Sequence, residues 1–173
     1  STENYGLYST YLSWETVLMM LVTLSLYKAM MNLYVKYENQ EMVLSAVCGL
    51  ELVLSLTWLI IGISFRNLVA ECLGLSPQLV CCLFASFIFQ AAVQCWSLYK
   101  RYIYDYKTLV AVTLLSTVGS TLFGVVTVVF VSPTAEARVL SNTIVMALIG
   151  IALYYSVFKK GKKFYDKRIW LFS

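Results

Sequence analysis

The chain has 173 residues, of which 60% are hydrophobic and 13% are charged, and its formal net charge is +4. Soluble proteins carry about twice that share of charged residues, and a soluble domain of this length could not bury so much apolar surface. The composition therefore excludes a soluble globular protein and predicts an integral membrane protein.

Five apolar runs are long enough to cross a membrane, because a spanning helix needs about 20 mainly apolar residues. They cover residues 14–35, 42–64, 74–98, 108–131 and 139–158. The runs do not alternate apolar and polar residues as barrel strands do, so they predict an all-α fold. The breaks between them are short, which favours antiparallel neighbours. We expect a single transmembrane domain over residues 1–173, built as a bundle of five antiparallel helices with a basic tail at 159–173.

The segment before the first run is open to two interpretations. Tyr5, Tyr8 and Tyr11 recur at every third residue. This spacing is compatible with a short interfacial helix outside the membrane, since tyrosine prefers the boundary between lipid and water. The alternative is a partly ordered lead-in to the first spanning helix.

The positions of lysine and arginine predict the orientation, because cytosolic loops are enriched in these residues. One side of the membrane receives Lys36, a group of three at 100–107 and six in the tail, whereas the other side receives only Arg66 and Arg138. The N-terminal segment has no basic residue. The sequence thus predicts an N-terminus outside the membrane and a C-terminus in the cytosol.

Several catalytic and cofactor-binding patterns are absent from the sequence. It contains no histidine, which excludes the Ser-His-Asp arrangement and histidine-bound haem or zinc. There is no glycine-rich phosphate loop, and none of the five cysteines forms a C-x-x-C pair. We expect no catalytic residues, no metal and no cofactor.

Polar residues deep inside the runs form one candidate binding site. Lys28 and Glu51 each lie roughly 12–14 Å from the predicted inner boundary, at a rise of about 1.5 Å per residue. Because their helices are expected to be adjacent and antiparallel, the two charges lie at nearly one depth and are predicted to pair. Gln90 and Gln94 share one face of the third helix at similar depth, and Ser116 lies at this depth in the fourth. Intramembrane charges usually face a partner or a water-filled cavity, so this layer is predicted to bind a polar solute or to line its path. Alternatively, Lys28 snorkels to the interface, and the other side chains only join helices, at about 0.6 kcal/mol per contact.

Two further features indicate packing and membrane contact. Ser116, Ser120 and Gly124 make a small-residue stripe that allows close helix approach, within the bundle or to a partner. The tail is polybasic and predicts contact with anionic lipids, or else a flank that only fixes the topology. Its basic residues are Lys159, Lys160, Lys162, Lys163, Lys167 and Arg168.

Short loops, smooth helix faces and the missing catalytic groups favour a non-catalytic subunit or scaffold of a larger membrane assembly. Its expected partners are the bilayer, anionic lipids at the cytosolic face, and other membrane subunits or a second copy, with no nucleic acid. The main alternative is a small transporter or channel that uses Lys28, Glu51 and Gln90. An intramembrane enzyme acting on lipid and a fragment of a seven-helix receptor are further alternatives. The expected location is a multi-pass position in the plasma membrane or an endomembrane.

Overall fold

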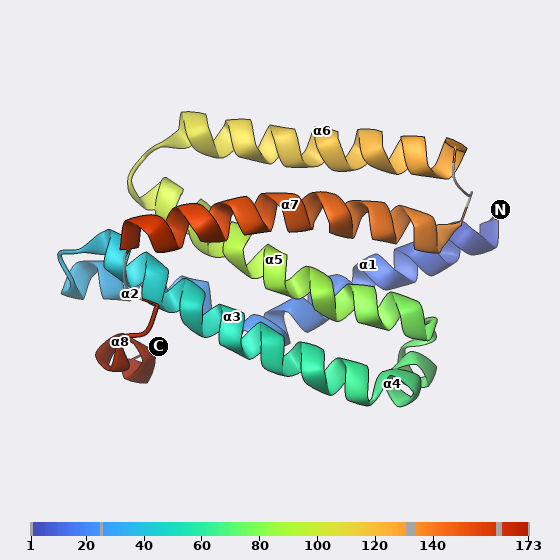
Figure 1. The fold of residues 1–173 in the computed structure, drawn as a ribbon, viewed down its shortest axis with the longest axis horizontal. Helices are drawn as coiled ribbons and strands as arrows, with labels where there is room; N and C mark the ends of the chain where they lie inside the picture. Colours follow the sequence, from blue (N-terminus) through green and yellow to red (C-terminus); the bar gives the residue numbers. More distant parts are fainter. Residues whose placement is uncertain (1, 25, 131–133, 162–163, 173) are drawn as a thin grey trace.

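The computed structural model describes residues 2–24, 26–130, 134–161 and 164–172, and the structure is 91% helix. No strand occurs within these ranges, so the predicted all-α fold is confirmed. The helices are α1 (Thr2–Thr23), α2 (Leu26–Lys36), α3 (Gln40–Ser64), α4 (Arg66–Leu73), α5 (Pro77–Tyr102), α6 (Tyr106–Phe130), α7 (Ala135–Gly161) and α8 (Lys167–Phe172). Figure 1 shows their arrangement.

Five helical segments are long and apolar enough to cross a membrane, as the sequence predicts. They are Asn4–Lys36, Gln40–Ser64, Pro77–Tyr102, Tyr106–Phe130 and Ala135–Gly161. The first combines α1 and α2, and the others are α3, α5, α6 and α7. Their number supports a multi-pass membrane protein, and nearly all of their bounds differ from the expected ones by one to ten residues. The first segment begins well before residue 14, and α4 occupies the connection expected after residue 64.

The first spanning segment is long and interrupted. α1 is continuous from Thr2, so the tyrosine-bearing segment is neither a separate interfacial helix nor a partly ordered lead-in. α1 ends at Thr23, and Leu24 adopts a left-handed backbone with φ of 49°. This conformation costs an ordinary residue roughly 1–2 kcal/mol. Non-helical backbone at membrane depth is tolerated where it is buried in protein or lines a cavity. We therefore expect packed protein or a cavity beside this interruption.

Local capping explains where several helices begin and end. The side chain of Asn39 accepts a hydrogen bond from Met42 N at 3.1 Å and caps α3. Ser76 caps α5 in the same way, with Pro77 in the first turn, where its missing N–H is no loss. Gly74 ends α4 in the left-handed conformation that glycine adopts at low cost. Asn39 thus marks the start of α3, and Gly74 and Ser76 mark the connection between α4 and α5.

α5 is the central helix and α6 is peripheral. α5 packs against α3 and α7, and it also contacts α1, α2, α4 and α6 (Figure 1). Within the most apolar window of each helix, 56% of α5 is buried but only 17% of α6. Two apolar cores flank α5, one around Leu33, Val47 and Cys95 and the other around Tyr11 and Phe87. Polar side chains on different faces of α5 therefore meet different neighbours.

Candidate functional site

The candidate site is built around Glu15, a carboxylate buried between α1 and α5. The residue is 8% exposed. Its Oε1 accepts hydrogen bonds from Gln90 Nε2 at 2.6 Å and from Ser86 Oγ at 3.0 Å. Both donors belong to neutral side chains on α5. Because both bonds end on Oε1, neither uses the second carboxylate oxygen, Oε2.

Glu15 lies deep in the first spanning segment because α1 starts so early. It follows Asn4 by eleven residues, or about 16 Å along a helix. Tyr11, Glu15 and Met19 repeat at intervals of four and are all buried, so they form the face of α1 that packs inward. Sequence reasoning missed Glu15 because it began the span at Trp14 and so placed this carboxylate at the membrane boundary. The three-residue spacing of the upstream tyrosines was the available signal that the helix extends further.

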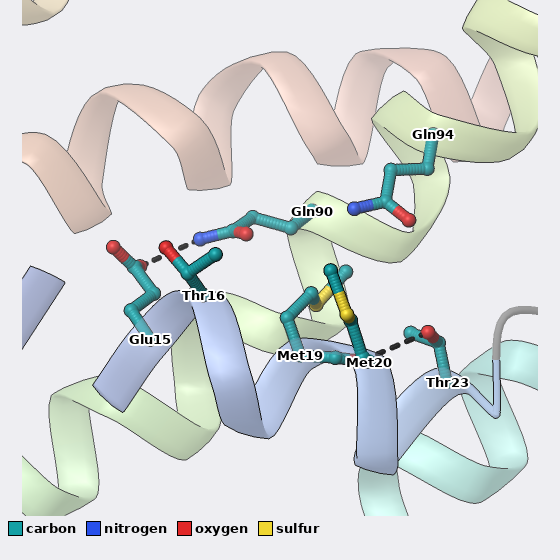
Figure 2. Close-up of a pocket in the computed structure, with 7 residues that line it drawn as sticks. All are labelled: Glu15, Thr16, Met19, Met20, Thr23, Gln90 and Gln94. Carbon is teal, nitrogen blue, oxygen red and sulfur yellow. Dashed lines mark hydrogen bonds between the residues drawn. The ribbon is translucent and has the colours of Figure 1, made fainter. Parts of the chain in front are cut away.

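Glu15 opens onto a cavity of about 270 Å³. Figure 2 shows the lining side chains from α1 and α5 converging on it. Thr16 and Met20 are exposed, so the cavity reaches the outer surface of the bundle, whereas Thr23 is buried beside the interruption at Leu24. The lining residues are Glu15, Thr16, Met19, Met20, Thr23, Gln90 and Gln94.

The lining combines carboxylate and hydroxyl oxygens with the amide groups of Gln90 and Gln94. The hydroxyl groups of Thr16 and Thr23 donate to backbone carbonyls one turn earlier in α1, each at 2.9 Å. Because the Thr16 proton is used in this bond, the Thr16 oxygen can offer only lone pairs to a ligand in the cavity. The Oε1 atom of Gln94 is buried and has no hydrogen-bond partner among the described residues. A buried amide oxygen left without a donor costs about 1–3 kcal/mol, and this oxygen is buried within the bundle, with almost no surface open to the cavity.

The five residues of the predicted polar layer lie in different surroundings. Gln90 and Gln94 line the cavity, and the other three, although described, lie outside its lining. Lys28 is exposed on α2, and Glu51 is fully buried on α3. Ser116 is buried on α6, where its hydroxyl donates to the Thr113 carbonyl at 2.8 Å. Pairing of Lys28 with Glu51 stays a prediction.

Glu51 occupies a second polar position, on the opposite side of α5. Its Oε2 accepts a hydrogen bond from the Cys95 thiol at 3.0 Å. Tyr154 on α7 belongs to the same core, and its hydroxyl donates to the Ile88 carbonyl at 2.8 Å. Gln94 and Cys95 are adjacent in sequence, but one lines the cavity beside α1 and the other contacts α3. α5 thus separates the two buried carboxylates.

The small-residue stripe on α6 contributes to packing against α7. Gly124 is buried, and a methyl group there would lie 3.7 Å from the side chains of Arg138 and Ser141. Ser116 is also buried, whereas Ser120 is partly exposed. A closer approach occurs at Gly150 on α7, where an added Cβ would lie 2.7 Å from Phe89 Cβ and 2.9 Å from Phe89 Cα. Gly150 therefore fixes the spacing between α7 and α5.

The end of the basic tail is docked on α3. Trp170 Nε1 donates to the Ala46 carbonyl at 2.9 Å, and Ile169 is fully buried. A Cβ at Gly49 would overlap the carbonyl oxygen of Phe164. Of the predicted lipid-contacting residues, Lys159, Lys160 and Arg168 are exposed, whereas Lys162, Lys163 and the side chain of Lys167 lie outside the described part of the structure.

Comparison with known proteins gives no relative from which a role could be taken. No model of a protein family, no curated protein and no solved structure matches the chain.

Proposed function

We propose that this chain is a small multi-pass membrane protein that binds a polar solute between α1 and α5 and carries it across the membrane. The observation that carries the proposal is the Glu15 carboxylate, which is buried at membrane depth and yet faces a cavity of about 270 Å³. An ionised side chain at the centre of a spanning helix costs about 2.5–3.5 kcal/mol in insertion measurements. Such groups usually mark a substrate path or a relay for ions.

The surroundings of Glu15 fit solute binding better than helix joining. A side chain that only joins two helices needs one satisfied partner in a packed interface. Glu15 has that partner in Gln90, but it also retains a carboxylate oxygen that neither bond uses. The cavity is slightly smaller than the 300–1,000 Å³, roughly, of pockets for drug-sized ligands. Its volume therefore fits a small solute.

The interruption after α1 supports movement at the site. Thr23 lines the cavity, and the next residue, Leu24, has the left-handed backbone. Discontinuous helices are frequent at the substrate sites of membrane transporters. We propose that α1 and α2 shift relative to each other at Leu24 when the solute enters and leaves.

The proposal includes the topology predicted from the sequence: five antiparallel spans with the N-terminus outside and the C-terminus in the cytosol. The uneven distribution of lysine and arginine supports this orientation. Cys72 on α4 is exposed and provides a native probe of the outer side. An impermeant maleimide should label it in intact cells, whereas Lys107→Cys in a Cys72→Ser background should react only after permeabilisation. The opposite pattern would invert the orientation.

Uptake by reconstituted vesicles tests the transport proposal. The full chain in phosphatidylcholine vesicles is given labelled butylamine, butyrate or 1-butanol, with protein-free vesicles as background. At least one probe should enter saturably, and Glu15→Gln should lower that uptake by tenfold or more. Glu71→Gln, at an exposed position on α4, is the matched control and should behave like the wild type. Equal uptake by all three proteins, at the protein-free level, would contradict the proposal.

A subunit of a larger assembly is the second candidate, and the exposure of α6 favours it. Apolar side chains cover the part of α6 that faces away from the bundle, including Leu114, Leu115, Val118 and Leu122. A partner helix could cover this face in place of lipid. Mass determination after purification in mild detergent would support this candidate by finding a stoichiometric partner. A monomer or homo-oligomer would count against it.

A further inference from the structure

We infer that the cavity between α1 and α5 recognises the primary ammonium group of a small amine. This inference rests on the proposed solute-binding function and specifies its substrate class. It is carried by three features of the cavity: a single charged side chain, a lining of hydrogen-bond acceptors, and a short apolar stretch beside them.

The charge of the lining selects a cation. Glu15 is the only charged residue among the seven that line the cavity, and its two donors on α5 are neutral. A ligand cation next to Oε2 would balance the carboxylate where lipid and protein provide little screening. An anion would instead meet a like charge at close range.

The hydrogen bonds of the lining select a ligand rich in donors. The hydroxyl groups of Thr16 and Thr23 each donate a hydrogen bond to a backbone carbonyl, and Gln90 Nε2 donates one to Glu15. Glu15 Oε2 and the Thr16 oxygen remain as acceptors at the Glu15 end of the cavity. A primary ammonium has three N–H donors and no acceptor, so it complements this lining. A quaternary ammonium has the charge but no such donors.

The remaining lining accommodates a short hydrocarbon stem. Met19 and Met20 follow Glu15 by about one helical turn, and Figure 2 shows their side chains between Glu15 and Gln94. Methionine is flexible and polarisable, so it adapts to ligands of different outline. Gln94 lies one turn beyond Gln90 on α5, about 6 Å further along the helix. An amine bound to Glu15 can therefore lay its stem along the methionines toward the Gln94 end of the cavity.

Ligand-induced stabilisation measures this selectivity directly. The full chain in phosphatidylcholine nanodiscs is titrated with butylammonium chloride, and the melting temperature reports the dissociation constant. Tetramethylammonium, sodium, 1-butanol and butyrate are the comparison probes. Butylammonium should bind saturably, at least tenfold more tightly than any of them.

Variants connect the binding to the cavity. Glu15→Gln should weaken butylammonium binding at least tenfold, and Glu71→Gln should leave it unchanged. If Glu15→Gln fails to fold, Thr16→Val tests the same lining, because this exposed residue has a β-branched replacement of similar shape. That variant should weaken binding severalfold.

The outcomes separate the inference from the proposed function. Equal binding of tetramethylammonium or sodium would overturn the inference, because recognition would not depend on N–H donors. Preferential binding of 1-butanol or butyrate, sensitive to Glu15→Gln, would also overturn it but would leave solute binding intact. If no probe of any class stabilises the protein, both the inference and the proposed function fail.

Discussion

Replacing Gly150 with alanine should destabilise the protein, because α7 approaches α5 closely at this residue. The added Cβ would lie 2.7 Å from Phe89 Cβ and 2.9 Å from Phe89 Cα. A Cα atom cannot move without shifting the helix, so the two helices must separate. Overpacking of this kind costs about 1–3 kcal/mol. Alanine recovers roughly 1 kcal/mol through its better helix propensity, so we expect a net loss of up to about 2 kcal/mol.

Gly119→Ala on α6 is the matched control. The nearest atom to its added Cβ is Val145 Cγ1, at an ordinary contact distance of 3.7 Å. Only the helix propensity changes there, so this variant should be more stable than the wild type by about 0.5–1 kcal/mol. Unfolding in mixed detergent micelles, followed by circular dichroism, measures both differences. Equal effects of the same sign at the two positions would refute the assigned spacing between α5 and α7.

Three further predictions concern the tail, the connection between α5 and α6, and the predicted ion pair. Trp170→Phe should lower the free energy of unfolding by about 0.5–1.5 kcal/mol, because the hydrogen bond to an α3 carbonyl is lost. The same variant should increase proteolysis of the tail, and unchanged cleavage would show that α8 is not docked. Lys100 donates to Asp105 at 2.6 Å and, as the main cause, lowers the pKa of this partly exposed carboxyl. Ionised Asp105 therefore contributes stability above its unfolded pKa, and this contribution is lost as pH falls through the lower folded value. Melting curves should show Asp105→Asn less stable than the wild type at pH 7 and equally stable once both are below that folded value; a pH-independent difference would contradict the ion pair. If Lys28 pairs with Glu51, Lys28→Met should destabilise the protein more than the double variant Lys28→Met/Glu51→Gln, and additive melting shifts would exclude the pair.

The spanning segments could be predicted from sequence because hydropathy is a local property. Each of the five runs contains enough apolar residues to be recognised without knowing its neighbours. The start of the first segment was harder to predict from the sequence. Asn4, Ser9 and Thr10 interrupt the apolar pattern there, yet α1 is helical through all of them. α4 was missed because it is too short to cross a membrane and lies among polar residues.

The candidate site could be predicted only in part, for a related reason. Gln90 and Gln94 were found because a four-residue spacing on one helix is visible in the sequence. Their partner Glu15 was not, since the contact joins residues 75 positions apart. Which face of α5 meets α1 and which meets α3 depends on how the bundle packs. The prediction accordingly combined groups that α5 keeps apart.

The two buried glutamates show why surroundings, rather than residue type or depth, determine a role. Both side chains are buried in spanning segments, and both accept hydrogen bonds from neutral donors on α5. Glu51 is fully enclosed beside Cys95 in an apolar core, so a solute could reach it only by separating α3 from α5. Glu15 faces a cavity whose lining includes exposed Thr16. A ligand can therefore reach Glu15 without unpacking the bundle, and we propose that this access makes Glu15, rather than Glu51, the site for a cation.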